Sequence, residues 1–280
     1  MHGHIGSGPV SVDLIAGAML LTAACLYLGG VATAYRRGHS WSVDKTMMWL
    51  LGLAVAASAM TGNLAAASHE SFTSHMLGHL LVGMVAPLLL VAGTPVTLAL
   101  RSLHLRQARR LSHALRSRPV RLLAHPVTTA LINVGSLWLL YTTPLFELML
   151  SSPLIHLLVN IHFLFAGYLF VASLVGTDPN PHRASFVLRS AVLVFALAAH
   201  GILAKHLYAH PPLGVPLVEA QSGSVLMFYG GDVADAALIC VLCLQWYRAA
   251  GKTVRPSSLP VVQRDQVSIG VGKRERAAER

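Results

Sequence analysis

The sequence predicts an all-α polytopic membrane helix bundle with seven transmembrane helices, its N-terminus outside and its C-terminus cytoplasmic. Of the 280 residues, 54% are hydrophobic and only 11% are charged, whereas soluble domains carry about 25% charged residues. The hydrophobic residues fall in long blocks, as expected of a chain that crosses a lipid bilayer several times. The basic residues gather in alternate loops between these blocks, and this asymmetry predicts the direction of each helix.

Each of the seven apolar blocks is long enough for a membrane helix, which needs about 20 residues. The fourth block is the shortest and ends at Pro144. The third contains Pro87 and Pro95, and such helix breakers are tolerated in a membrane where neighbouring helices satisfy the backbone. No Lys or Arg precedes the first block, unlike the basic start of a signal peptide. The blocks are residues 12–34, 46–67, 75–100, 124–143, 153–176, 186–209 and 224–247.

The basic side chains predict the orientation. Apart from Lys205, every Lys and Arg lies in or beside the loops after the first, third and fifth blocks, or in the C-terminal tail. The positive-inside rule makes that side cytoplasmic, so the net charge of +10 needs no nucleic-acid partner. We expect a transmembrane domain over residues 1–248 and a basic, disordered cytoplasmic tail over 249–280. The basic segment 101–123 has spaced leucines, which favour an amphipathic helix on the inner leaflet.

With this orientation, histidines and carboxylates gather in the outer half of the bundle. His75 and His79 are four positions apart, so they share one face of a helix. Ionisable residues inside membrane spans usually face a cavity or a partner, and imidazole suits Cu, Zn, Fe and Ni. The pattern therefore predicts a candidate metal site. Its possible members are His75, His79, His156, His162, His200, His206, Asp232 and Asp235.

Geometry limits how many of these residues can share one ion. His156 and His162 are six positions apart, which places them about 120° apart around a helix. We therefore expect one cluster of His75, His79 and Asp232, completed by His162 or His200, or else two sites. Alternatives without a metal are interfacial hydrogen bonds, a His200–Asp232 pair that joins two helices, and a proton path.

Two other motifs are weaker. The stretch HESFTSH, from His69 to His75, begins like a zincin motif, but Thr73 stands where that motif needs its second histidine. Cys240 and Cys243 lie toward the inner half of the last block, away from the histidines, and are interpreted as packing residues.

Several stretches resemble the seven-helix CtaG family of bacterial cytochrome c oxidase assembly factors, and the last resembles its actinobacterial branch. The first is the most specific, because His75-x-x-x-His79 precedes Ala86-Pro87, Pro95 and Arg101. The stretches are HMLGHLLVGMVAPLLLVAGTPVTLALR (75–101), IHLLVNIHFLFAGYLF (155–170) with the GTDPNPHR that follows it, AAHGILA (198–204), and LMFYGGDVAD (226–235) with WYR (246–248).

The resemblance implies a non-enzymatic assembly factor in a bacterial plasma membrane, with delivery of copper as the suspected role. It implies cytochrome c oxidase subunits and the lipid bilayer as partners, with an extracytoplasmic copper donor as a further candidate, and it leaves the oxidation state of the copper open. Asp235 stands where the family is expected to have a carboxylate. Carried over residue by residue, the resemblance implicates His75, His79, His156, His162, His200 and Asp232 as metal ligands.

Two other functions compete with this one. A transporter for copper or protons would need a polar path that continues inward, and few polar residues lie below the outer histidines, Asn133 and Ser136 among them. A membrane haem-binding redox protein could use histidine pairs as axial ligands, and an optical spectrum of the purified protein would show such a haem.

Overall fold

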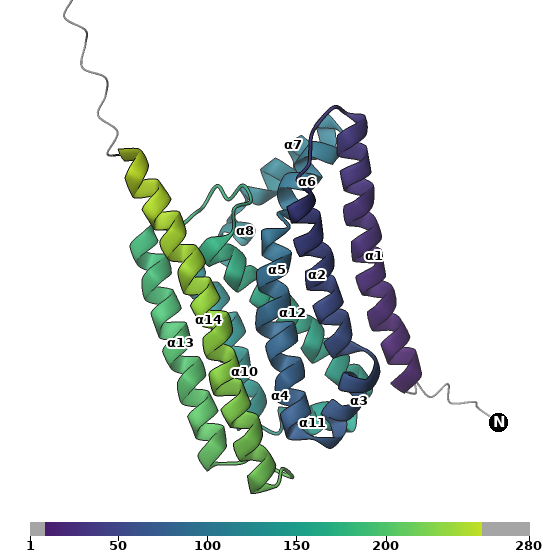
Figure 1. The fold of residues 1–280 in the computed structure, drawn as a ribbon, viewed down its shortest axis with the longest axis vertical. Helices are drawn as coiled ribbons and strands as arrows, with labels where there is room; N and C mark the ends of the chain where they lie inside the picture. Colours follow the sequence, from purple (N-terminus) through teal and green to yellow (C-terminus); the bar gives the residue numbers. More distant parts are fainter. Residues whose placement is uncertain (1–8, 254–280) are drawn as a thin grey trace, which may run out of the picture.

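The structure is a computed structural model that describes residues 9–253, and every regular element in that range is helical (Figure 1). Six helices or helical runs are long and apolar enough to cross a membrane. A bent pair, Pro126–Thr142 and Leu145–Ser151, makes a seventh span if it is counted as one. The predicted multi-pass helix bundle is therefore confirmed. Residues 254–280 of the predicted tail lie outside the described range, and the last helix continues to Thr253.

The first two spans form one side of the bundle. Helix α1 (Pro9–Arg36) packs against α2 (Val43–Met60) and α6 (Pro95–Ser102). Tyr27 of α1 joins them, because its ring stacks on Trp49 of α2 at 4.9 Å and its hydroxyl donates to Gly93 O at 2.7 Å. Figure 1 shows α1 at the opposite edge of the bundle from α13 (Phe186–Ala209) and α14 (Leu217–Thr253).

The second apolar block does not form one continuous helix. Helix α2 ends at Met60, and α3 (Gly62–Glu70) begins directly after an extended Thr61. Gly62 has a φ of +74°, which glycine adopts readily because it has no Cβ. A second break follows at Ser71, where the backbone is extended before α4 (Phe72–Leu80) starts. The two breaks redirect α3, so the residues of its last turn do not follow the face of either neighbouring helix.

Two spans contain a π-helical turn near their middle. In the third span, η1 (Leu81–Val85) separates α4 from α5 (Ala86–Ala92). Pro87 explains this turn, because it lacks the N–H that would bond to the carbonyl of Gly83. In the fourth span, η2 (Leu131–Gly135) separates α9 (Pro126–Ala130) from α10 (Ser136–Thr142). Such π-turns often occur at functional sites, and both of these line the same cavity described below.

The basic loops meet at one end of the bundle, which carries α6, α7 (Leu105–Leu115) and α8 (Arg118–Leu123) (Figure 1). Asp178, from the loop after the fifth span, accepts hydrogen bonds from the backbone N–H groups of Val96 and Thr97 at 3.1 and 2.7 Å. Arg37 donates to the carbonyl of Leu103. The amphipathic helix predicted within 101–123 is divided into two shorter helices, α7 and α8, and none of their residues is buried. That this end faces the cytoplasm stays a prediction from charge.

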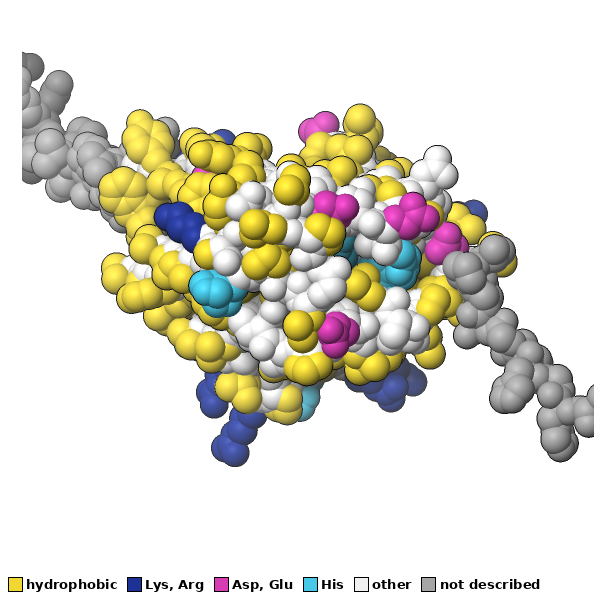
Figure 2. Space-filling model, turned by 90° about the horizontal axis from the view of Figure 1, so that it is seen from below, with side chains coloured by type: hydrophobic (Ala, Val, Ile, Leu, Met, Phe, Trp, Pro, Cys, Tyr) yellow, Lys and Arg dark blue, Asp and Glu magenta, His cyan; other side chains and the backbone are white. Residues whose placement is uncertain are grey.

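The opposite end carries α3 and α11 (Leu145–Ser151), and α12 (Pro153–Val175) starts there. Helix α11 bends by 81° from the preceding span and buries Phe146 and Met149. Glu219 of α14 accepts a hydrogen bond from the N–H of Phe72 at 2.9 Å, so α14 is tied to the start of α4. Figure 2 looks onto this end, where acidic side chains and histidines are visible and most of the Lys and Arg in view lie at the rim.

Candidate functional site

Five histidines of the bundle, four of them buried, form two neighbouring groups. We call the first the outer histidine group: His69, His75 and His156, with Tyr141. We call the second the inner chamber: the cavity lined by His79, His200 and Asp235, with Met84 and Asn133. The two groups are connected through α4, because His75 and His79 are one helical turn apart on that helix.

Short contacts join the members of the outer histidine group. Nδ1 of His156 lies 2.9 Å from Nε2 of His69, so the two imidazoles share one hydrogen bond. Nε2 of His75 lies 3.0 Å from the hydroxyl of Tyr141. The ring centroids of His75 and His156 are 6.0 Å apart. Three imidazoles from α3, α4 and α12 therefore follow one another from the end of the bundle inward.

A small pocket connects this group with the surface. It has a volume of about 70 Å³, which is enough for a few water molecules or a hydrated ion. His69 and His156 line it together with the polar side chains of Asp13 and Asn160. His69 is exposed, whereas His156 is buried. The pocket thus lies at the end of the bundle that carries α3, and two imidazoles, a carboxylate and an amide are among its lining groups.

Aromatic side chains enclose the deeper part of the group. The ring centroid of Phe146, on α11, lies 5.3 Å from that of His75, and the ring of Phe72 lies at 6.2 Å. Tyr141 completes this wall and contacts both phenylalanines. Only 6% of His75 is exposed. The bend that starts α11 therefore places the apolar ring of Phe146 over the imidazole of His75.

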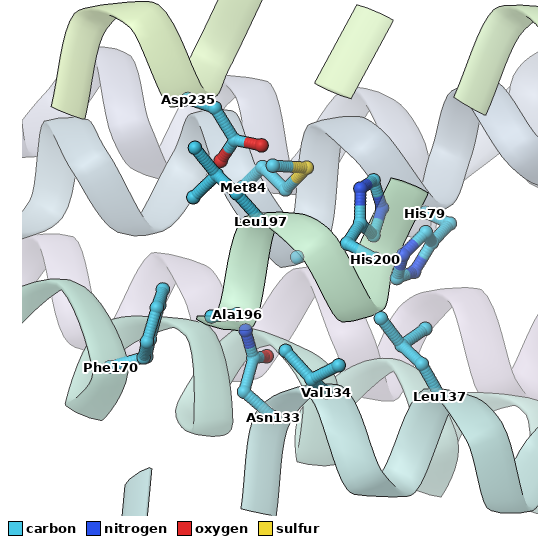
Figure 3. A pocket seen from close by; sticks show the side chains of 11 residues that line it. His79, Met84, Asn133, Val134, Leu137, Phe170, Ala196, Leu197, His200 and Asp235 are labelled. Carbon is cyan, nitrogen blue, oxygen red and sulfur yellow. The ribbon is translucent and has the colours of Figure 1, made fainter. Parts of the chain in front are cut away.

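The inner chamber contains two imidazoles whose hydrogen-bonding capacity is not used by the described residues. His79 and His200 are each 7% exposed, and the Nε2 atom of each is buried without a hydrogen-bond partner. Both residues line a cavity of about 30 Å³ together with Asp235, which is 8% exposed. Figure 3 shows the imidazoles on one side of the cavity and Asp235 on the other, with the side chain of Met84 between them in this view.

Glycines make room for both rings of the chamber. A Cβ at Gly83 would lie 3.2 Å from Cε1 of His79, and a Cβ at Gly231 would lie 2.6 Å from Cε1 of His200. Real Cβ atoms almost never come as close as the second value. Residue 231 must therefore be glycine if the ring of His200 is to keep this position.

The π-turns place further donors at the chamber. Met84 belongs to η1 and Asn133 to η2, and both line the cavity. A buried nitrogen without a hydrogen bond costs about 1–3 kcal/mol, and buried polar groups of this kind usually have a water molecule or an ion as partner. Two such nitrogens, a thioether and a carboxylate around one small cavity are a suitable donor set for a water molecule, a proton or a metal ion.

Four of the six predicted metal ligands are buried and are divided between the two groups, and the other two lie outside both cavities. His75, His79, His156 and His200 are buried in the two groups, whereas His162 and Asp232 are exposed and line neither cavity. The expected single cluster is divided between two places. Among residues 9–253, no group of three or more His, Cys, Asp or Glu side chains is placed closely enough to hold a metal ion. Metal binding therefore stays a prediction.

Two members of the two groups, His69 and Tyr141, had no place in the site expected from the sequence, and a third, Asp235, was not among the six implicated ligands. His69 was set aside with the zincin motif, and the break at Ser71 is what turns it toward His156. Tyr141 comes from a span without any predicted ligand. Asp235 stands three positions after Asp232; it was a candidate member of the metal site but was left out of the ligand set that the resemblance implicates. The signal that favours Asp235 is its position one turn of α14 from Gly231, the residue that contacts His200.

Comparisons with known proteins agree with the sequence resemblance. The family model of the cytochrome c oxidase caa3 assembly factor, Caa3_CtaG, matches residues 25–249. An uncharacterized protein of Mycobacterium bovis is 35% identical over 195 residues, which cover 67% of this chain and 30% of that protein. An uncharacterized protein of Mycobacterium leprae is 31% identical over 224 residues, covering 78% and 32%. The chain spans about a third of the length of these curated relatives. No solved structure matches it.

Proposed function

Because the chain belongs to the family of cytochrome c oxidase caa3 assembly factors, we propose that it is a non-enzymatic assembly factor that binds copper and delivers it to an oxidase subunit. Binding takes place on the extracytoplasmic side, at the end of the bundle that carries the histidines. The ion comes from an extracytoplasmic copper donor, and copper is cargo rather than a permanent cofactor. The oxidase subunit and the bilayer are the partners of the protein.

The observation that supports this proposal most is the pair of open imidazole nitrogens in the inner chamber. Nε2 of His79 and Nε2 of His200 have no partner among the described residues, and they share the chamber with Asp235. A bare carboxylate at the centre of a membrane helix costs roughly 2.5–3.5 kcal/mol on insertion scales. A bound cation offsets this cost and occupies both nitrogens. The thioether of Met84 adds a soft donor of the kind that selects Cu(I).

A proton relay is the second function that the same residues could perform, because neutral imidazoles and a buried carboxylate also conduct protons. A haem is a poorer fit, since a chamber of about 30 Å³ cannot enclose a macrocycle. Copper content distinguishes the assembly role from the proton relay, which needs no metal.

The test is the copper content of the client oxidase in the native host. We expect oxidase purified from a deletion strain to contain less copper per haem than the wild type, and excess copper in the medium to restore part of it. Complementation with the wild-type chain should restore the copper fully, and so should His210→Leu, which changes an exposed histidine at the same end. His79→Leu should fail to restore it. An oxidase with its full copper content in the deletion strain would remove the delivery role.

A further inference from the structure

We propose that His69 and His156 form a separate loading site for Cu(I), from which the ion passes through His75 to the inner chamber. This inference rests on the proposed function and adds to it an external site with its own ligands and a direction of transfer. The two imidazoles come from α3 and α12, two elements that are far apart in sequence. Their side chains meet at a small pocket that both of them line, and His69 is exposed there.

The loading site offers only two ligands, and this low number supports a site that passes the ion on rather than one that stores it. The two imidazoles offer two nitrogens, and Cu(I) accepts two nitrogen ligands in a near-linear arrangement. Nε2 of His69 and Nδ1 of His156 are 2.9 Å apart, whereas two imidazole nitrogens about 2 Å from one ion would be roughly 4 Å apart. The rings must therefore separate by about 1 Å. Helix α3 allows this small shift, since extended residues flank it at Thr61 and Ser71.

The surroundings of the loading site favour a cation. Asp13 lines the pocket and brings a negative charge to it, while its carboxylate also accepts a hydrogen bond from the N–H of Gly62 at 3.3 Å. Asn160 adds a neutral amide. No Lys or Arg lines this pocket. A hydrated cation in this pocket therefore has acceptor oxygens beside the imidazoles and no cationic side chain to repel it.

The proposed route inward is a series of neighbouring imidazoles. Each is either in ring contact with the next or one helical turn away from it. The centroid of His156 lies 4.5 Å from that of His69 and 6.0 Å from that of His75. His79 follows His75 one turn later on α4, at a side-chain spacing of about 5–6 Å. At the end of the route, the chamber offers two imidazoles, a thioether and a carboxylate. The richer donor set lies inside, so the equilibrium favours movement of the ion from the loading site to the chamber.

The test compares two variants of similar side-chain volume, His69→Met and His69→Leu, in the purified full chain in detergent. Methionine offers Cu(I) a thioether, whereas leucine offers no ligand atom. Cu(I) is presented as the complex of a chromophoric chelator, and both the rate of transfer and the final stoichiometry are measured. His69→Leu should slow loading at least about tenfold, because it removes one of two ligands, and loss of a residue that only supports a ligand already weakens metal sites by about 10–100-fold. It should leave the final stoichiometry unchanged, and His69→Met should load at nearly the wild-type rate.

The outcomes separate this inference from the function on which it rests. If wild type takes up Cu(I) and His69→Leu loads equally fast, the loading site is wrong while the assembly role stands. The same holds if both variants are equally slow, because the effect would then come from packing rather than ligation. If wild type takes up no Cu(I) and the oxidase of the deletion strain keeps its copper, both proposals are overturned.

Discussion

Gly231 of α14 lies against the imidazole of His200 on α13, so closely that a Cβ at residue 231 would come within 2.6 Å of Cε1 of the ring. We predict that Gly231→Ala displaces the imidazole and lowers the copper retained by the purified protein. The matched control is Gly251→Ala on the same helix, where an added Cβ would meet nothing within 4 Å. Alanine favours a helix by about 1 kcal/mol over glycine, which supports folding of both variants, but only Gly231→Ala must also move a neighbouring ring. Equal copper retention in the two variants would show that copper binding does not depend on the position of the His200 imidazole.

The orientation of the bundle can be tested by cysteine labelling in intact cells. Cys25, Cys240 and Cys243 are first replaced by alanine, and single cysteines are then introduced at Ser117 and Ser151. Ser117 lies between α7 and α8, and exposed Ser151 ends α11 at the opposite end of the bundle. A membrane-impermeant maleimide should label Ser151→Cys from outside and Ser117→Cys only after permeabilisation. The reverse pattern would place the histidines on the cytoplasmic side.

Asp178 should stabilise the fold without any role in copper binding. Its carboxylate accepts hydrogen bonds from the N–H groups of Val96 and Thr97 and from the Thr97 hydroxyl. Asp178→Ala leaves the start of α6 without these bonds, and we expect a loss of about 1–3 kcal/mol. The measurement is the thermal unfolding midpoint in detergent, with copper retention as the second readout. Thr97→Val removes one bond and should lower the midpoint less. A loss of copper in Asp178→Ala at low temperature would contradict this separation of roles.

The fold could be predicted because bilayer thickness and loop charge leave few alternatives for a chain of this composition. All seven apolar blocks correspond to helical segments of the structure. The breaks inside them could not be placed as well. Gly62 and Ser71 turn the chain twice within nine residues, and a helical pattern carries no signal for the angle of such a turn. No proline closely follows the π-turn at Leu131–Gly135, so the sequence gives no signal for this turn.

The candidate site could be predicted only as a set of residues. The spacing of His75 and His79 places them on one face, and the structure agrees. The spacing alone does not predict that His75 contacts Tyr141 while His79 faces the chamber, because those contacts depend on which helices lie opposite. Likewise, Asp232 and Asp235 are both near the middle of α14, and only packing decides that Asp235 is the buried one.

The most direct test of the copper-binding claim is the copper affinity of Asp235→Asn beside that of Asp232→Asn, measured on purified protein by competition with a Cu(I) chelator. Each substitution removes one negative charge with little change in size, but only Asp235 lines the chamber with His79 and His200. We predict that Asp235→Asn weakens copper binding about 10–100-fold, the effect typical of a lost carboxylate beside a metal site, and that Asp232→Asn binds as the wild type does. Equal affinity in wild type and Asp235→Asn, or a larger loss in Asp232→Asn, would contradict the account.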